Sequence, residues 1–130
     1  MSAWLWVRTD VMYAIHERQL AEHGGLSGIL DNGRLESALS RPQNIAAYDA
    51  PDAAALAAAY ACGLALNHGF ADGNKRTAWV VARLFLADNG YSLSFDAADA
   101  VFTMESVATG MLSEAGLADW FRARMQFVRE

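Results

Sequence analysis

Residues 53–88 read AAALAAAYACGLALNHGFADGNKRTAWVVARLFLAD, two apolar segments on either side of a short polar loop. The first segment, 53–66, is mostly alanine and leucine, and it begins directly after Asp52, a good helix N-cap. The second segment, 74–88, places apolar residues on nearly every side of a helix, which is typical of a buried helix. We therefore predict an all-α fold in which the loop joins two central helices.

Capping residues and helix breakers set the boundaries of two further helices before residue 53 and of the second central helix. Glycine ends a helix because it adopts the left-handed conformation of a C-cap, and proline disfavours helical geometry in the residue preceding it. The predicted boundaries are Thr9 or Asp10 to about His23, ended by Gly24-Gly25; the short helix RLESALSR, 34–41, ended by Pro42; and 74–88, closed by Asn89-Gly90.

The chain after residue 90 is predicted to contain one extended piece and two helices. The segment YSLSF, 91–95, alternates between apolar and polar residues, which is compatible with a short strand. The apolar residues predicted to share one face are Val101, Met104, Ala108 and Met111 in the first helix, and Leu117, Trp120, Phe121, Met125 and Val128 in the second.

Length and composition indicate one globular domain over residues 1–130. The chain is 54% hydrophobic and has only two prolines, so it is not a disordered polypeptide. Its formal charge of −5 argues against direct nucleic-acid binding, since proteins that bind nucleic acid are usually basic. A small local cationic site for phosphate is compatible with this charge.

The cysteine content and the apolar segments favour a cytoplasmic protein. The single cysteine, Cys62, excludes an intrachain disulfide and lies among alanines, where it is most simply a small buried residue. The longest uncharged stretch, 53–71, is mostly alanine, so we interpret it as part of a buried helix, with no membrane span. The N-terminal sequence MSAWLWVRTD lacks the basic start of a signal peptide.

The loop NHGFADGNKRT, 67–77, combines residues that suit an anion-binding helix N-terminus. Gly73 lets the backbone approach a ligand, and Asn74 is predicted to be the N-cap. Lys75 and Arg76 fall in the first turn, where a cation is unfavourable by roughly 0.3–1 kcal/mol. Two cations at this end of a helix are explained if a phosphate binds between them.

The other side chains of the loop fit phosphoryl or nucleotidyl transfer. Asp72 offers the oxygen ligand that Mg²⁺ prefers when its other ligands are substrate phosphates and water. His68 carries an imidazole, a side chain that can take a proton from an attacking hydroxyl group. Phe70 is interpreted as an anchor that holds the loop against the core. Base, metal ligand and anion site together predict an active site.

Each of these residues taken singly has a simpler interpretation. A loop histidine is more often structural or merely exposed, a Lys-Arg pair is usually a solvated surface, and Asp-Gly-Asn is a common turn. Their convergence on one helix N-terminus favours the functional interpretation. His16 and His23 lie seven residues apart on one helix face, but no cysteine or carboxylate cluster accompanies them, so we interpret them as structural, with His16 at most supporting the site.

The segment HGFADGNKRT, 68–77, resembles the HxFx(D/N)(A/G)NKR motif of death-on-curing (Doc) toxins, the short branch of the Fic superfamily. The resemblance extends to HGGLSGILDNGRLESALSRPQ, 23–43, and to ARLFLADNGYSL, 82–93, and it covers about residues 8–126. It implies a compact all-α fold and a toxin that uses ATP and Mg²⁺ to modify elongation factor Tu and stop translation. It also implies a small antitoxin encoded beside the toxin.

The resemblance assigns a role to each residue of the motif. His68 would be the general base, Asp72 the Mg²⁺ ligand and Phe70 a structural residue. The phosphates would be held by Gly73, Asn74, Lys75 and Arg76. Two positions depart from relatives that carry a basic residue there: Leu30, which precedes Asp31, and Leu66, two residues before the histidine. A contribution of the N-terminal segment around Asp31 to substrate binding is therefore not expected, and Leu66 leaves the approach to the histidine less basic than in relatives.

Three activities remain open from the sequence: transfer of the γ-phosphate of ATP, transfer of AMP as in longer Fic relatives, and an idle module that binds its antitoxin. In AMP-transferring relatives a glycine follows the motif asparagine, whereas here Lys75 fills that position, which favours phosphate transfer. None of the six glutamates precedes Gly or Asn, so the inhibitory [S/T]xxxE[G/N] helix of longer relatives is missing. Inhibition is therefore expected from a separate antitoxin.

Overall fold

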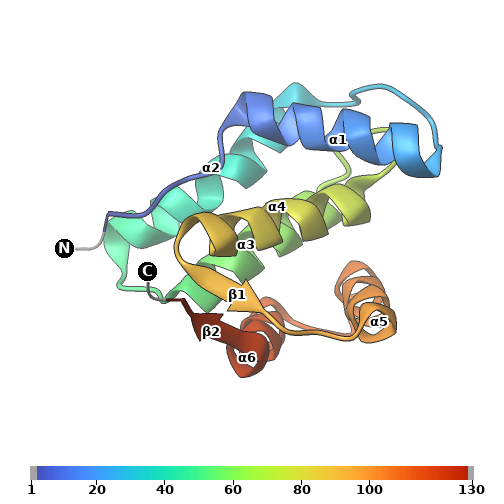
Figure 1. The fold of residues 1–130 in the computed structure, drawn as a ribbon. Coiled ribbons are helices and arrows are strands. Elements are labelled where there is room, and N and C mark those ends of the chain that lie inside the picture. The colour runs from blue at the N-terminus through green and yellow to red at the C-terminus, as the bar shows by residue number, and fades with distance from the viewer. Residues whose placement is uncertain (1–2, 129–130) are drawn as a thin grey trace.

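The computed structural model describes residues 3–128, which form helices around a central pair and one small sheet (Figure 1). The elements are α1 (Thr9–His23), α2 (Asn32–Tyr48), α3 (Ala53–Leu66), α4 (Asn74–Asp88), β1 (Tyr91–Leu93), α5 (Ala97–Ala108), α6 (Glu114–Arg124) and β2 (Met125–Phe127). The predicted all-α fold is confirmed, with the two short strands as a minor addition. Within residues 3–128, no helix combines the length and apolar character needed to cross a membrane.

The helix α3 forms the centre of the molecule and packs against α2, α4, α5 and α6. Its alanines are small enough for the surrounding helices to approach closely, and almost every residue from Ala53 to Ala65 is buried. Asp52 caps α3 as predicted, because its side chain accepts a hydrogen bond from the N–H of Ala55 at 2.9 Å. The helix α4 is buried on one face only, since Arg83 is exposed and Leu84 is half-buried.

The helix α2 is longer than predicted and contains Pro42 in its interior. Proline removes one helical hydrogen bond and costs roughly 3 kcal/mol in a helix interior. Here Pro42 is buried together with Leu35, Ala38 and Leu39 on the face that packs against α3. Burial of this apolar face offsets the cost of the proline, so the prediction that the helix ends before Pro42 is wrong.

The boundaries of α1 were only partly predictable. The helix starts after Arg8, and no side chain caps it, so the predicted cap by Thr9 or Asp10 is wrong. At its other end Gly24 has a φ of 76°, and its N–H donates to the carbonyl oxygen of Leu20 at 2.8 Å. Gly24 therefore ends the helix where predicted, although its ψ of −177° differs from that of the expected left-handed C-cap.

The C-terminal segment was predicted as one helix, but the chain leaves the helix after Arg124 and forms β2. This strand pairs antiparallel with β1, with Tyr91 opposite Phe127. The prediction that Met125 and Val128 continue the apolar face of α6 is therefore wrong. The reason is tertiary: β1 lies beside this segment and offers backbone partners that the local periodicity does not reveal.

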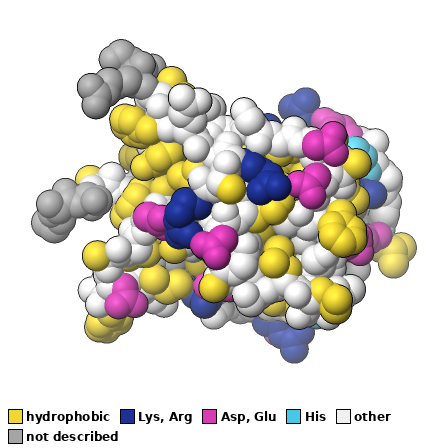
Figure 2. Space-filling view, turned by 90° about the horizontal axis from the view of Figure 1, so that it is seen from below, with side chains coloured by type: hydrophobic (Ala, Val, Ile, Leu, Met, Phe, Trp, Pro, Cys, Tyr) yellow, Lys and Arg dark blue, Asp and Glu magenta, His cyan; other side chains and the backbone are white. Residues whose placement is uncertain are grey.

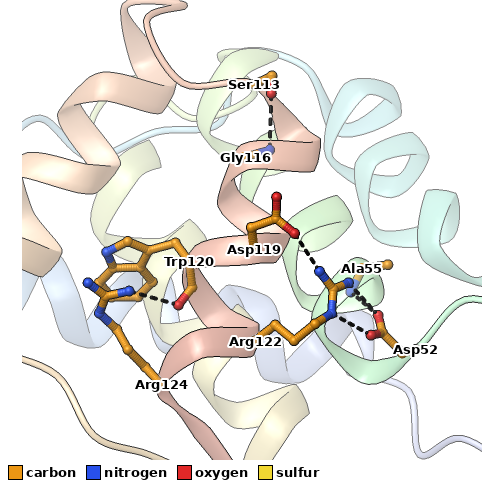
Figure 3. A network of polar contacts seen from close by, with 8 residues as sticks. All are labelled: Asp52, Ala55, Ser113, Gly116, Asp119, Trp120, Arg122 and Arg124. Atoms are coloured by element: carbon orange, nitrogen blue, oxygen red, sulfur yellow. Dashed lines mark hydrogen bonds and ion pairs between the residues drawn. The ribbon is translucent and has the colours of Figure 1, made fainter.

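The helix α6 is tied to the start of α3 by Arg122 (Figure 3). Its guanidinium donates to both carboxylate oxygens of Asp52, at 2.8 and 3.0 Å, and to Asp119 at 2.6 Å. The guanidinium of Arg124 lies 4.2 Å from the ring centroid of Trp120. On the face formed by α5, α6 and the sheet, basic side chains are interspersed with acidic ones (Figure 2). No continuous basic surface is visible on that face.

Candidate active site

A pocket of about 710 Å³ lies between the motif loop, the start of α4 and the helix α5. All six residues predicted to form the site line this pocket: His68, Asp72, Gly73, Asn74, Lys75 and Arg76. The structure thus brings the predicted residues together on one concave surface. Their individual roles stay predictions.

The N-cap of α4 is Gly73, not Asn74 as predicted. Gly73 adopts the left-handed conformation, with φ 80° and ψ 14°. Asn74 is the first helical residue, and its side-chain amide bonds both backbone groups of Phe70: Oδ1 accepts from the N–H at 3.1 Å, and Nδ2 donates to the carbonyl at 3.0 Å. The amide is therefore used to close the loop. A phosphate at this position would meet the backbone N–H groups of the first helical turn, which have no helical partner.

Phe70 anchors the loop, as expected for a structural aromatic residue. Its side chain is 1% exposed and stacks on the ring of His16, with centroids 3.6 Å apart and planes 5° apart. His16 is itself buried, and its Nε2–H donates to the backbone carbonyl of Asp72 at 2.8 Å. One histidine of α1 therefore holds the motif loop at two places. His23, by contrast, is exposed.

The carboxylate of Asp72 is exposed to the pocket and oriented by two backbone N–H groups. Leu26 donates to Oδ2 at 3.2 Å, and Gly73 donates to Oδ1 at 2.8 Å. These hydrogen bonds, from Leu26 first, lower the pKa of Asp72, and the charge of Arg76 adds to the effect. The carboxylate is therefore ionised and retains free lone pairs. This donor fits Mg²⁺, which takes most of its ligands from phosphates and water.

The segment 24–31 runs alongside the motif loop and supports it. The N–H groups of Leu30 and Asp31 both donate to the carbonyl of Gly69, and Ala71 N–H donates to the carbonyl of Gly28. At Gly25, where φ is +125°, an added Cβ would lie 2.7 Å from Asp72 Oδ2, so a side chain would displace the carboxylate. This role is not evident from the sequence, because Leu26 lies 46 residues before Asp72 in the chain.

His68 is exposed on the pocket wall and has an unusual backbone conformation. Its φ of 51° is the only positive value at a non-glycine residue within 3–128. Such a conformation costs about 1–3 kcal/mol and persists only where the surrounding structure enforces it. The bonds that hold Gly69 and Phe70 supply this enforcement, since they fix the chain directly after the histidine.

The two cations of the first helical turn differ in their surroundings. Arg76 is exposed, whereas the Nζ of Lys75 lies 2.5 Å from an Oε1 of Glu105 on α5. Glu105 was not identified from the sequence, because it lies 30 residues beyond Lys75 and belongs to no motif. It adds a second carboxylate to the wall of the pocket.

The other end of the pocket is apolar and was also missed. It is lined by Trp79, whose ring meets the ring of Phe95 edge-to-face at 5.1 Å, and by Val101, Met104 and Ala108 of α5. The predicted shared face of α5 is therefore confirmed for Val101, Met104 and Ala108, which line the pocket together. The residues of α5 that enter the core are Ala100, Thr103, Met104 and Val107, and Met111 is exposed beyond the helix.

Cys62 is buried outside this pocket, and burial raises the pKa of its thiol to about 12. The thiol is thus protonated at neutral pH and is not a nucleophile. Across residues 3–128, no group of three or more His, Cys, Asp or Glu side chains is arranged to hold a metal ion. A magnesium ion here would therefore need ligands from the substrate in addition to Asp72.

Comparison with known proteins places the motif in a family. A family model with the description Fic/DOC family matches residues 6–86 of this chain. The chain is 35% identical over 117 residues to Protein kinase doc of Escherichia phage P1, covering 89% of this chain and 92% of that protein. It is 44% identical over 90 residues to Toxin Doc of Mycolicibacterium smegmatis, covering 66% of this chain and 69% of that protein. All six predicted site residues lie within the family match, whereas Glu105 lies outside it.

Proposed function

This chain belongs to the Fic/DOC family, and on that premise we propose that it is the toxin of a toxin–antitoxin pair. Its proposed activity is that of an ATP-dependent kinase that transfers the γ-phosphate to a hydroxyl group of a translation factor. Elongation factor Tu is the favoured target, and the site of action is the cytoplasm. The names of the two relatives, one a kinase and one a toxin, support this proposal.

One observation carries the proposal: His68, Asp72, Lys75 and Arg76 line a single pocket at the N-terminus of α4. The free N–H groups and the positive end of the helix dipole favour a bound phosphate, and the two cations strengthen that preference. The carboxylate of Asp72 lies at the same end of the pocket. The arrangement therefore suits a phosphate chain with a metal ion beside it.

In the proposed reaction His68 accepts the proton of the attacking hydroxyl group, and ADP is the leaving group. The hydroxyl oxygen of the target attacks the γ-phosphorus while its proton passes to an imidazole nitrogen of His68. The bond from the γ-phosphorus to the bridging oxygen breaks, and ADP leaves with that oxygen. When bound, Mg²⁺ would neutralise part of the phosphate charge, with Asp72 as its protein ligand. The bonds from Asn74 and His16 keep the loop in place during the reaction.

Transfer of AMP is the second candidate, since longer Fic relatives carry it out. The side chain of Lys75 argues against it, because it extends along the pocket wall toward α5 where those relatives have a bare glycine backbone. An ATP molecule oriented for attack at the α-phosphate would have to share this space. An orientation with the γ-phosphate near His68 uses the charge of Lys75 instead.

The distinguishing experiment supplies the purified protein and elongation factor Tu with ATP labelled at either the α or the γ position. Incorporation of the γ-label with release of ADP is expected. Incorporation of the α-label with release of pyrophosphate would establish AMP transfer instead. Transfer of neither label, with nucleotide bound, would point to the idle module as the third alternative.

Regulation is proposed to come from a separate antitoxin, because no glutamate of this chain precedes Gly or Asn. A partner that orders on binding to the toxin would supply the missing inhibition. Expression of the intact chain without a partner is expected to arrest growth, and co-expression of the neighbouring gene is expected to restore it. Unimpaired growth in the first experiment would contradict a toxin.

A further inference from the structure

Lys75 is the only lysine in the chain, since the other nine of its ten basic residues are arginines. Its Nζ lies 2.5 Å from Glu105 Oε1, so the pair joins the first turn of α4 to the last turn of α5 across the pocket wall. Both residues line the pocket in which a phosphate is proposed to bind. The cation that would hold a phosphate therefore already has a carboxylate partner.

The ion pair between Lys75 and Glu105 is weak enough for a bound phosphate to replace it. The side chain of Lys75 is 44% exposed and that of Glu105 is 53% exposed, and exposed ion pairs contribute only about 0–1 kcal/mol. Lysine presents a single point charge on a flexible stem, so its ammonium can move between partners without rearranging the backbone. The phosphate groups of a nucleotide offer more charge and more acceptor oxygens than one carboxylate does.

Glu105 cannot keep its present position without cost once a phosphate binds. Its carboxylate would then face another anion in the same pocket, and like charges at close range are destabilising. The side chain of Glu105 is about half exposed, and its contact with Lys75 is its only hydrogen bond among the residues that the structure describes. The side chain of Glu105 is thus free to withdraw toward solvent when Lys75 turns to the ligand.

We infer that Glu105 is a positioning residue of the phosphate site: an internal counter-ion of Lys75 that an incoming phosphate must displace. The identity of the phosphate as that of ATP rests on the proposed function. Displacement costs the same for every ligand that uses Lys75. It therefore lowers the affinity for the product ADP and for ATP by the same factor. By weakening ADP binding, the carboxylate favours product release.

The first test measures the affinity of the full chain for Mg-ATP and ADP by calorimetry. Glu105→Gln is expected to tighten binding of each nucleotide by about two- to fivefold, the range expected for loss of a weak competing ion pair. Glu114→Gln is the matched control, because it removes the same charge from an ion pair with Arg41 at a different pocket. Its affinities are expected to equal those of the wild type. Unchanged or weaker binding by Glu105→Gln would overturn the inference.

The second test observes Lys75 directly. A protein labelled with ¹⁵N-lysine has one side-chain Nζ signal because the chain has one lysine. This signal is expected to differ between the wild type and Glu105→Gln without ligand, and to move to a common position when inorganic tripolyphosphate is added. The exchange of partners is contradicted if the Nζ signal is the same in the wild type and Glu105→Gln, or if tripolyphosphate does not shift it. This test also applies if Glu105→Gln is too unstable for calorimetry.

The two tests separate this inference from the proposed function. Equal nucleotide affinity of the wild type and Glu105→Gln would contradict the proposed role of Glu105, whereas the proposed nucleotide-dependent activity would stand. Failure of the wild type to bind nucleotide, with tripolyphosphate still moving the Nζ signal, would contradict the kinase and support the exchange. Failure to bind either ligand would overturn both.

Discussion

The motif loop contains two groups of side chains that differ in how firmly the protein holds them. Phe70 and Asn74 are tied to buried or backbone groups on both sides, with His16 stacked against the loop from α1. His68 and Arg76, in contrast, are exposed on the pocket wall. The first group builds a rigid base, and the second presents reactive groups from it. Asp72 belongs to both, since backbone donors orient its exposed carboxylate.

This difference explains how a loop of 11 residues can hold a fixed backbone and still present exposed polar side chains to the pocket. Burial of the Phe70 ring and the hydrogen bonds of the Asn74 amide offset the entropy lost when the loop backbone is fixed. The reactive groups then need no protein partners of their own and remain available to a substrate. Substitutions in the two groups should accordingly affect different properties, stability in one and activity in the other.

The largest effect is expected for His68→Ala. The side chain is exposed, so the midpoint of thermal unfolding should be close to that of the wild type, whereas loss of a general base costs about 10²–10⁴ in rate. Transfer of labelled phosphate and growth arrest measure the activity. His23→Ala is the matched control, because it removes an exposed histidine away from the pocket and should retain full toxicity. A toxic His68→Ala variant would contradict the assignment of the base.

Phe70→Ala is expected to act on stability. Removal of a fully buried phenylalanine typically costs about 3–5 kcal/mol of unfolding free energy, and here it also removes the ring on which His16 stacks. Phe102→Ala removes the same ring from a position that is 70% exposed and should cost less than about 0.5 kcal/mol. Urea denaturation measures both. Equal stability of the two variants would mean that the loop is not anchored through Phe70.

Asp72→Ala and Arg76→Ala separate the metal ligand from the phosphate ligand. Asp72→Ala should weaken nucleotide binding only when Mg²⁺ is present, because the carboxylate acts through the metal. Arg76→Ala should weaken binding with or without Mg²⁺, by about tenfold for loss of one charge-assisted contact. Calorimetry with Mg²⁺ and with a chelator distinguishes the cases. Wild-type affinity of both variants for Mg-ATP would contradict the proposed phosphate site.

The smallest effect concerns the backbone that orients Asp72. Gly25→Ala would push a Cβ against Oδ2 and disturb the hydrogen bond from Leu26, so the pKa of Asp72 should rise toward its ordinary value of 3.8. Gly24→Ala is the matched control, since it also places alanine at a positive φ but meets nothing within 4 Å. NMR titration of the carboxylate measures the pKa.

The sign of the pH dependence follows from the lowered pKa of Asp72 in the folded wild type. Its contribution to stability is present above the pKa of the unfolded chain and is lost as the pH falls through the lower, folded pKa. Mg²⁺-dependent nucleotide binding should likewise fail at a higher pH in Gly25→Ala than in Gly24→Ala. Identical pH profiles for the two variants would show that the hydrogen bond from Leu26 has no role.

Much of the candidate site was predictable because its residues are contiguous. His68, Asp72, Lys75 and Arg76 fall within nine residues at a helix start, so local geometry alone brings them to one place. Glu105, Leu26 and the apolar wall of α5 were not predictable in this way. Glu105 contacts Lys75 from 30 residues further along the chain, Leu26 donates to Asp72 from 46 residues before it, and α5 lines the pocket only through tertiary packing, which neither periodicity nor a motif encodes.

The helical fold followed from features that act over one or two turns. Apolar periodicity, Asp52 as a cap and glycine at helix ends depend on neighbouring residues, and the structure has central helices at 53–66 and 74–88 where these features place them. Two helix boundaries that were predicted wrongly depend on packing against segments far away in the sequence. Pro42 is tolerated because its face is buried, and residues 125–127 leave the helix because β1 offers backbone partners. Local sequence therefore set the elements and the reactive groups, whereas packing between distant segments set which face of each element became core and which became pocket.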